Sequence, residues 1–74
     1  MNINDILKLA QEISSEYENV LSIKVNVAGF EFSFLNDEKE FCTFIYSIEN
    51  DIIVKKLYVK NELSFIKKER IVLS

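Results

Sequence analysis

The apolar residues of the chain change their spacing along its length, and each change marks a new predicted element. Between residues 3 and 17 they recur at steps of three and four, which is typical of one face of an α-helix. Between residues 20 and 35 they alternate with polar residues, as in a strand pair with one apolar face. Between residues 41 and 59 they lie on both faces of a predicted strand pair. That second pair needs cover from water on two sides.

The N-terminal segment is predicted to be an amphipathic helix of about four turns. Either Asn2 or Asn4 is suited to cap its first turn, and Asn19 is suited to the left-handed conformation that ends a helix. A helix of this length with one apolar stripe is marginal alone in water, so we expect it to lie across a sheet. Its apolar stripe consists of Ile3, Ile6, Leu7, Ala10, Ile13 and Tyr17.

The first strand pair changes phase at Ala28 and Gly29, which predicts a two-residue turn at these positions. This turn places three apolar pairs on one face: Val27 with Phe30, Val25 with Phe32, and Ile23 with Phe34. The opposite face is polar. A bulge within one long, bent strand is the alternative explanation of the phase shift.

The second strand pair is predicted to turn at Asn50 and Asp51 after a polar loop at residues 36–40. Its register sets Cys42 opposite Val59, Phe44 opposite Leu57, and Ile48 opposite Ile53. These pairs extend the apolar face that the helix covers.

Residues 62–74 fit two structures. A strand pair that turns around Lys67 to Glu69 explains the β-branched and aromatic residues at both ends of the segment, and it is favoured for that reason. A helix capped by Asn61 fits nearly as well. The predicted fold class is therefore α+β, with an N-terminal amphipathic helix packed on an antiparallel β-sheet of four to five strands. Residues 1–74 are expected to form a single small domain.

The composition describes an ordered domain with a thin core. At 74 residues, a chain buries roughly 60% of the surface that it exposes when unfolded, so contacts with a partner would add substantially to its stability. Cys42 is the only cysteine, which excludes an internal disulfide and favours a reducing compartment. No apolar run approaches the length of a membrane span. We therefore expect a cytoplasmic protein without membrane contact.

The residues needed for most catalytic chemistry are missing from the sequence. The chain has no histidine, the commonest general base and metal ligand, and a single glycine cannot form a phosphate-binding glycine loop. Without an activator, Cys42 is expected to be a small core residue. The acidic loop of Asp37, Glu38 and Glu40 lacks the ligand spacing of a calcium loop and is expected to be solvated. The sequence predicts no enzyme, no cofactor, no metal and no small-molecule ligand.

Charge divides the chain into two unequal parts. Residues 1–51 carry ten acidic and three basic side chains, a net charge of −7, whereas residues 52–74 carry six basic and two acidic side chains, a net charge of +4. One explanation of the basic part is a surface that binds nucleic acid. Lysines that protect an edge strand from aggregation are the better explanation. One explanation of the acidic part is that its carboxylates imitate the phosphates of DNA. A solvated helix face is the better explanation.

The apolar residues on the second face of residues 41–59 are the candidate functional site. We predict that Phe41, Ile45, Val54, Lys56 and Tyr58 form a protein interface, with a homodimer or another protein as the partner. The alternative is internal cover by residues 63–73. The predicted function is a small inhibitor or adaptor encoded by a phage or mobile element. A structural subunit of a homo-oligomer and a weak nucleic-acid binder are the other hypotheses.

One resemblance concerns the start of the chain. Residues 1–7, with the sequence Met-Asn-Ile-Asn-Asp-Ile-Leu, are similar to the start of a small phage-encoded anti-CRISPR family that blocks Cas9 by mimicking DNA with acidic residues. The resemblance implies an acidic inhibitor of a host nuclease. The acid-rich C-terminal half of that family is replaced here by a basic one, and no functional residue can be carried over.

Overall fold

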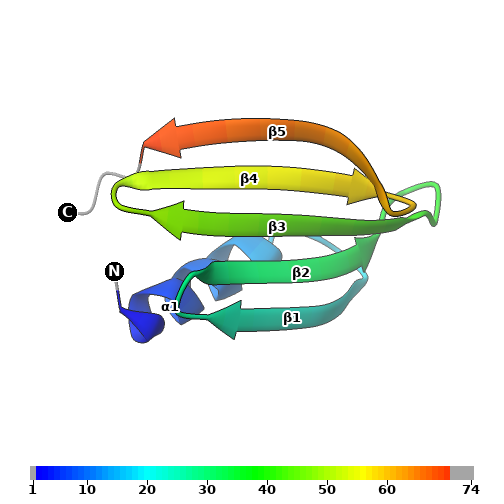
Figure 1. Cartoon of the computed structure of the whole chain (residues 1–74). Helices are drawn as coiled ribbons and strands as arrows, with labels where there is room; N and C mark the ends of the chain where they lie inside the picture. The colour runs from blue at the N-terminus through cyan, green and yellow to red at the C-terminus, as the bar shows by residue number, and fades with distance from the viewer. Residues whose placement is uncertain (1, 71–74) are drawn as a thin grey trace.

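The computed structural model describes residues 2–70 as one helix packed on a five-stranded antiparallel sheet, which confirms the predicted α+β class (Figure 1). The strands follow one another in the sheet in chain order, so every connection joins two neighbours. The elements are α1 (Ile3–Ser14), β1 (Val20–Asn26), β2 (Gly29–Leu35), β3 (Phe41–Glu49), β4 (Ile52–Val59) and β5 (Glu62–Arg70). At twelve residues, α1 is too short to cross a membrane, and the described residues form no other helix.

Helix α1 is capped by Asn2 and lies over one face of the first two strands. The Asn2 side-chain oxygen accepts a hydrogen bond from the Asp5 backbone amide at 2.9 Å, which satisfies one of the free donors of the first turn. The helix ends at Ser14, one turn earlier than the apolar stripe suggests. Tyr17 lies beyond the helix and still packs on the core, with ring centroids 5.3 Å from Phe32 and 4.9 Å from Phe34.

The core lies between α1 and the helix-side face of β2 and β3. Its aromatic rings come from alternate positions of these strands, because successive side chains of a strand point to opposite faces. Full burial of such a side chain stabilises the fold by roughly 1.5–3 kcal/mol. The buried apolar side chains are Ile6, Ala10, Phe30, Phe32, Phe34, Cys42, Phe44 and Tyr46.

The register predicted for the first strand pair is wrong by two residues. Val25 pairs with Phe30 and Ile23 pairs with Phe32, so the turn lies at Val27 and Ala28. Because the shift is an even number, Ile23, Val25 and their partners keep the predicted face, whereas Val27 lies in the turn and is 82% exposed. Two separate strands form, so the alternative of one bent strand is also wrong.

Gly29 explains the shift, because it belongs to β2 and not to the turn. Its φ is +150°, a conformation that side chains rarely adopt, and a Cβ atom at this position would overlap the carbonyl oxygen of Tyr46 in β3. The turn itself is held by the Asn26 side-chain oxygen, which accepts from the Ala28 amide at 2.8 Å. The glycine is therefore needed for contact with β3.

The second strand pair has the predicted register. Cys42 pairs with Val59, Phe44 with Leu57, and Ile48 with Ile53. The turn lies at residues 50 and 51, where Asn50 adopts the expected left-handed conformation with φ 54°.

The C-terminal segment continues the sheet as a strand. β5 pairs with β4 along its length, with an irregularity that leaves Ser64 as an extra residue between Leu63 and Phe65. The strand interpretation is confirmed and the helix is excluded for residues 62–70. The turn expected around Lys67 to Glu69 is wrong, because these residues lie within β5. Residues 71–74 lie outside the described part of the chain.

A candidate protein-binding face of the sheet

The candidate site is the face of β3, β4 and β5 that points away from α1, which we call the reverse face. Pairing places its residues together, because residues directly opposite one another in neighbouring strands share a face. Phe41 is 42% exposed and Ile66 is 52% exposed. The apolar members of the reverse face are Phe41, Ile45, Ile52, Val54, Tyr58, Leu63 and Ile66.

The five residues predicted from the sequence all lie on this face. Ile45, Val54, Lys56 and Tyr58 are half-buried by their neighbours in the sheet, and Phe41 is exposed. Ile45 stands opposite Lys56 in β4, and Lys56 stands opposite Ile66 in β5, so apolar residues of β3 and β5 flank a lysine of the middle strand. The predicted set missed the contribution of β5.

Residues 63–70 do not cover the reverse face. They form most of β5, which lies beside β4 in the same sheet instead of across it (Figure 1). The only helix among residues 2–70 packs on β1 and β2 from the other side. Residues 71–73, the rest of the segment considered as cover, lie outside the described part. Within residues 2–70, the second apolar face therefore has no second layer.

The neighbouring strands β2 and β1 are mostly polar on the same side of the sheet as the reverse face. Ser33 and Thr43 stand opposite each other there, and their hydroxyl groups form a hydrogen bond of 3.0 Å. Further along, Lys24 of β1 stands opposite Glu31 of β2. The first hairpin thus presents a mostly polar surface on this side of the sheet, with Leu35 opposite Phe41 as an apolar exception at the end of β2.

A shallow hollow adjoins Ile45 on the border between the polar and apolar parts. It has a volume of about 170 Å³, and Gly29, Glu31 and Ser47 are among the residues that line it. Gly29 lets β2 approach the Tyr46 carbonyl of β3 beside this hollow. The signal available in the sequence was a lone glycine next to an aromatic strand, which marks a close approach of backbones. The sequence interpretation assigned that glycine to the turn and so missed the hollow.

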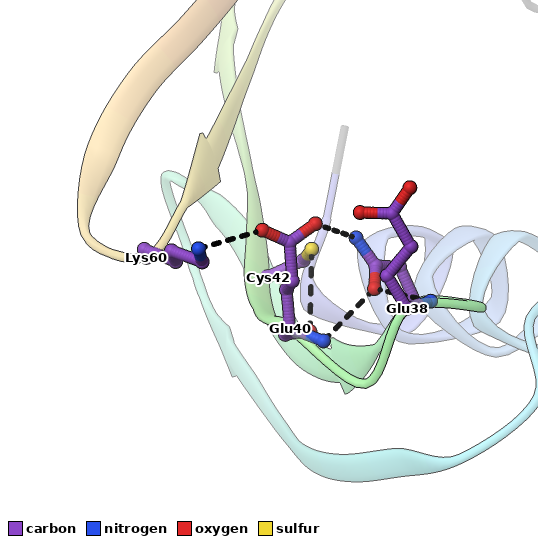
Figure 2. A network of polar contacts seen from close by, with 5 residues as sticks. Glu38, Glu40, Cys42 and Lys60 are labelled. Atoms are coloured by element: carbon purple, nitrogen blue, oxygen red, sulfur yellow. Dashed lines mark hydrogen bonds and ion pairs between the residues drawn. The ribbon is translucent and has the colours of Figure 1, made fainter.

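The acidic loop at residues 36–40 is organised by its own side chains (Figure 2). The Asn36 side-chain oxygen accepts from the amides of Glu38 and Glu40, and its NH₂ group donates to the Glu40 carboxylate at 3.0 Å. The other carboxylate oxygen of Glu40 lies 3.1 Å from the ammonium group of Lys60. The hydrogen bond from Asn36 and the contact with Lys60 hold the pKa of Glu40 below its usual range.

This loop connects the two hairpins and offers no metal site. The Lys60 amide also donates to the carbonyl of Phe41, so the turn between β4 and β5 is fastened to the start of β3. No cluster of three metal-ligating side chains occurs among residues 2–70. Cys42 is buried, its thiol donates to the Glu40 carbonyl at 3.6 Å, and burial raises its pKa, so the reactive thiolate is disfavoured.

Comparisons of the chain with protein-family models, with curated proteins and with solved structures found no match. The resemblance of residues 1–7 to anti-CRISPR proteins therefore gains no further support. The assignment of the candidate site is based on the geometry of the sheet alone.

Proposed function

We propose that this protein is a non-enzymatic binding module of the cytoplasm, acting as a small inhibitor or adaptor that docks on another protein through the reverse face. The observation that carries the proposal is the group of apolar residues that β3, β4 and β5 place on one face of the sheet, where residues 2–70 supply no second layer. The sequence supports a binding role over catalysis, because it contains no histidine. Origin from a phage or mobile element belongs to the same proposal.

The architecture supports docking because a sheet with an apolar face is normally covered by a second layer. Large contiguous apolar patches on a protein surface mark interaction sites. Here α1 supplies the second layer on one side of β1–β3, and a partner would supply it on the other side of β3–β5.

Phe41 and Tyr58 are the proposed anchors of the contact. Aromatic residues near the centre of an interface contribute most of its binding energy, and truncation of such an anchor costs at least about 2 kcal/mol, or roughly a 30-fold loss of affinity. Tyr58 lies near the end of β4, the middle strand of the reverse face, between Thr43 of β3 and Leu63 of β5, and Phe41 begins β3 at the same end.

The test is affinity capture from cells of the source organism, with proteins quantified by mass spectrometry. The variants are Ile45→Lys and Tyr58→Ala on the reverse face, and Phe65→Ala on the helix side of β5 is the matched control. We expect the two reverse-face variants to lose the captured protein and the control to keep it. Circular dichroism and denaturant unfolding must show that all three variants remain folded.

Two results would refute this function. Capture of the same protein by Ile45→Lys and by the unmodified chain would show that the reverse face is not the contact. Unfolding of Ile45→Lys and Tyr58→Ala would show that this face is internal. The homodimer hypothesis predicts a mass of two chains in light scattering at micromolar concentration, and Ile45→Lys would restore the mass of one.

A further inference from the structure

Three cations stand on the reverse face beside its apolar residues. Pairing places Lys56 between Ile45 and Ile66, Lys68 opposite Val54, and Arg70 opposite Ile52. Long basic side chains lay their aliphatic stems along apolar surface and hold the charged group at its rim. The apolar residues of β4 and β5 thus alternate with positive charges across the strands.

These cations have no anionic partner among residues 2–70. The two ion pairs of the described chain join Lys60 to Glu40 and Lys67 to Glu69, and Lys67 and Glu69 lie on the helix-side face. On the reverse face of β3–β5, Glu49 at the end of β3 is the only acidic residue. The local net charge of this face is therefore +2, from three cations and one anion.

We propose that the partner presents a protein surface of apolar residues interspersed with carboxylates, which would pair with Lys56, Lys68 and Arg70. This inference deepens the proposed function and depends on it. Charge across an interface selects partners, because like charges brought together cost several kcal/mol and opposite charges speed encounter.

A second copy of this chain fits the surface poorly. Isologous contact through a two-fold axis repeats the same patch on both sides, so it would bring six cations and only two copies of Glu49 into one interface. An anionic membrane also fits poorly, because the basic segments that bind such membranes carry about four to eight lysines or arginines. This face carries three.

The net charge of the whole chain predicts the opposite preference, for a basic ligand. At a net charge of −3, the chain as a whole attracts cations. Preference for an acidic ligand would therefore have to come from a local arrangement of charge, and the reverse-face variant tests whether Lys56, Lys68 and Arg70 supply it.

The experiment uses a phage-displayed library of 16-residue amphipathic peptides as the probe. Half of the positions are drawn from Leu, Ile, Phe and Tyr, and the others from equal shares of Asp, Glu, Lys, Arg and Ser. The unmodified protein is compared with Lys56→Glu/Lys68→Glu/Arg70→Glu. The control, Lys8→Glu/Lys39→Glu/Lys67→Glu, has the same net charge and changes no residue of the reverse face, because Lys67 lies on the helix side of β5.

We expect peptides enriched on the unmodified protein to be acidic, and those enriched on the reverse-face variant to be basic. The control should keep the acidic preference. For one enriched acidic peptide, each single change of Lys56, Lys68 or Arg70 to Met should weaken binding by roughly 1.5- to 5-fold.

Enriched peptides without a charge preference would overturn the inference and leave the proposed function standing, provided that Ile45→Lys abolishes their binding. Absence of any enrichment that Ile45→Lys abolishes would overturn both. Binding to phosphatidylserine vesicles that the reverse-face variant loses would assign the cations to a membrane and overturn the inference. Dimerisation that Ile45→Lys abolishes would assign the face to a second copy, with the same consequence.

Discussion

The three-stranded part of the molecule, α1 with β1–β3, differs from the β4–β5 hairpin in its cover. In the first part, α1 and Tyr17 close one face of the sheet, and Phe32 there is only 1% exposed. In the hairpin, every residue of β5 is exposed, and Phe65 is 41% exposed although it is also an aromatic residue on the helix-side face. Apolar sequence is present in both regions, and the position of the helix determines which one becomes core.

The hairpin partly covers itself on the helix side. Lys55 of β4 places its ammonium group 4.5 Å from the centroid of the Phe44 ring, and Phe65 of β5 meets the same ring edge-on at 6.3 Å. On the reverse face, none of the described residues provides such a lid. The sheet therefore has three environments. They are a core under the helix, a margin on the helix side where Lys55 and Phe65 cover Phe44, and the uncovered reverse face.

The largest expected effect tests the difference between core and margin. Phe32→Ala should reduce the free energy of unfolding by about 3–5 kcal/mol, because it leaves a cavity among the packed rings. Phe65→Ala, the same change at the margin, should cost about 1 kcal/mol. Denaturant unfolding followed by circular dichroism measures both values.

A domain of this size has a total stability of roughly 4–11 kcal/mol, so Phe32→Ala is expected to leave part of the protein unfolded. Phe32→Leu keeps most of the volume and provides a measurable second variant. Equal losses for Phe32→Ala and Phe65→Ala would show that the hairpin is covered as well as the core.

The next effect tests how β2 is joined to β3. Gly29→Ala should reduce the free energy of unfolding by about 2 kcal/mol or more, because a Cβ atom would overlap the Tyr46 carbonyl and the backbone conformation would be strained. Ala28→Gly, one residue earlier in the exposed turn, should cost less than about 1 kcal/mol. If Gly29 mattered only for the turn, the two changes would have similar effects.

The same glycine shows why one hairpin was predicted with its correct register and the other was not. For β3 and β4, the local turn residues Asn50 and Asp51 set the register, and both lie next to each other in the sequence. For β1 and β2, the conformation of Gly29 is required by Tyr46, which is 17 positions away. A local pattern cannot reveal such a contact, so the glycine was assigned to the turn.

The candidate site was predicted in part. The period of two in residues 41–59 placed Phe41, Ile45, Val54, Lys56 and Tyr58 on one face, and their pairing in the structure agrees. The contribution of Leu63, Ile66, Lys68 and Arg70 was missed, because a turn was expected where β5 runs straight. Whether these residues bind a protein stays a prediction.

A smaller effect tests the margin above Phe44. Lys55→Met keeps the aliphatic stem and removes the charge, so it should lower the free energy of unfolding by about 0.5–1 kcal/mol through loss of the cation–π contact. Lys56→Met, the adjacent residue on the reverse face, should leave the stability nearly unchanged. An equal loss in both variants would mean that charge in general, and not the aromatic contact, stabilises β4.

The smallest effect concerns Glu40, which links the turn between β4 and β5 to the loop before β3. The pKa of its carboxyl group is lower in the folded protein than the ordinary value of 4.5, chiefly because Asn36 and then Lys60 hydrogen-bond the charged form. A lowered folded pKa contributes stability above the unfolded pKa, and this contribution is lost as the pH falls through the folded value. We therefore expect the difference in unfolding free energy between the unmodified protein and Glu40→Gln to be constant from pH 7 to about 5.5 and to shrink below pH 4.5. Urea unfolding at a series of pH values measures it, and a difference that does not change with pH would show that the contacts of Glu40 do not depend on its charge.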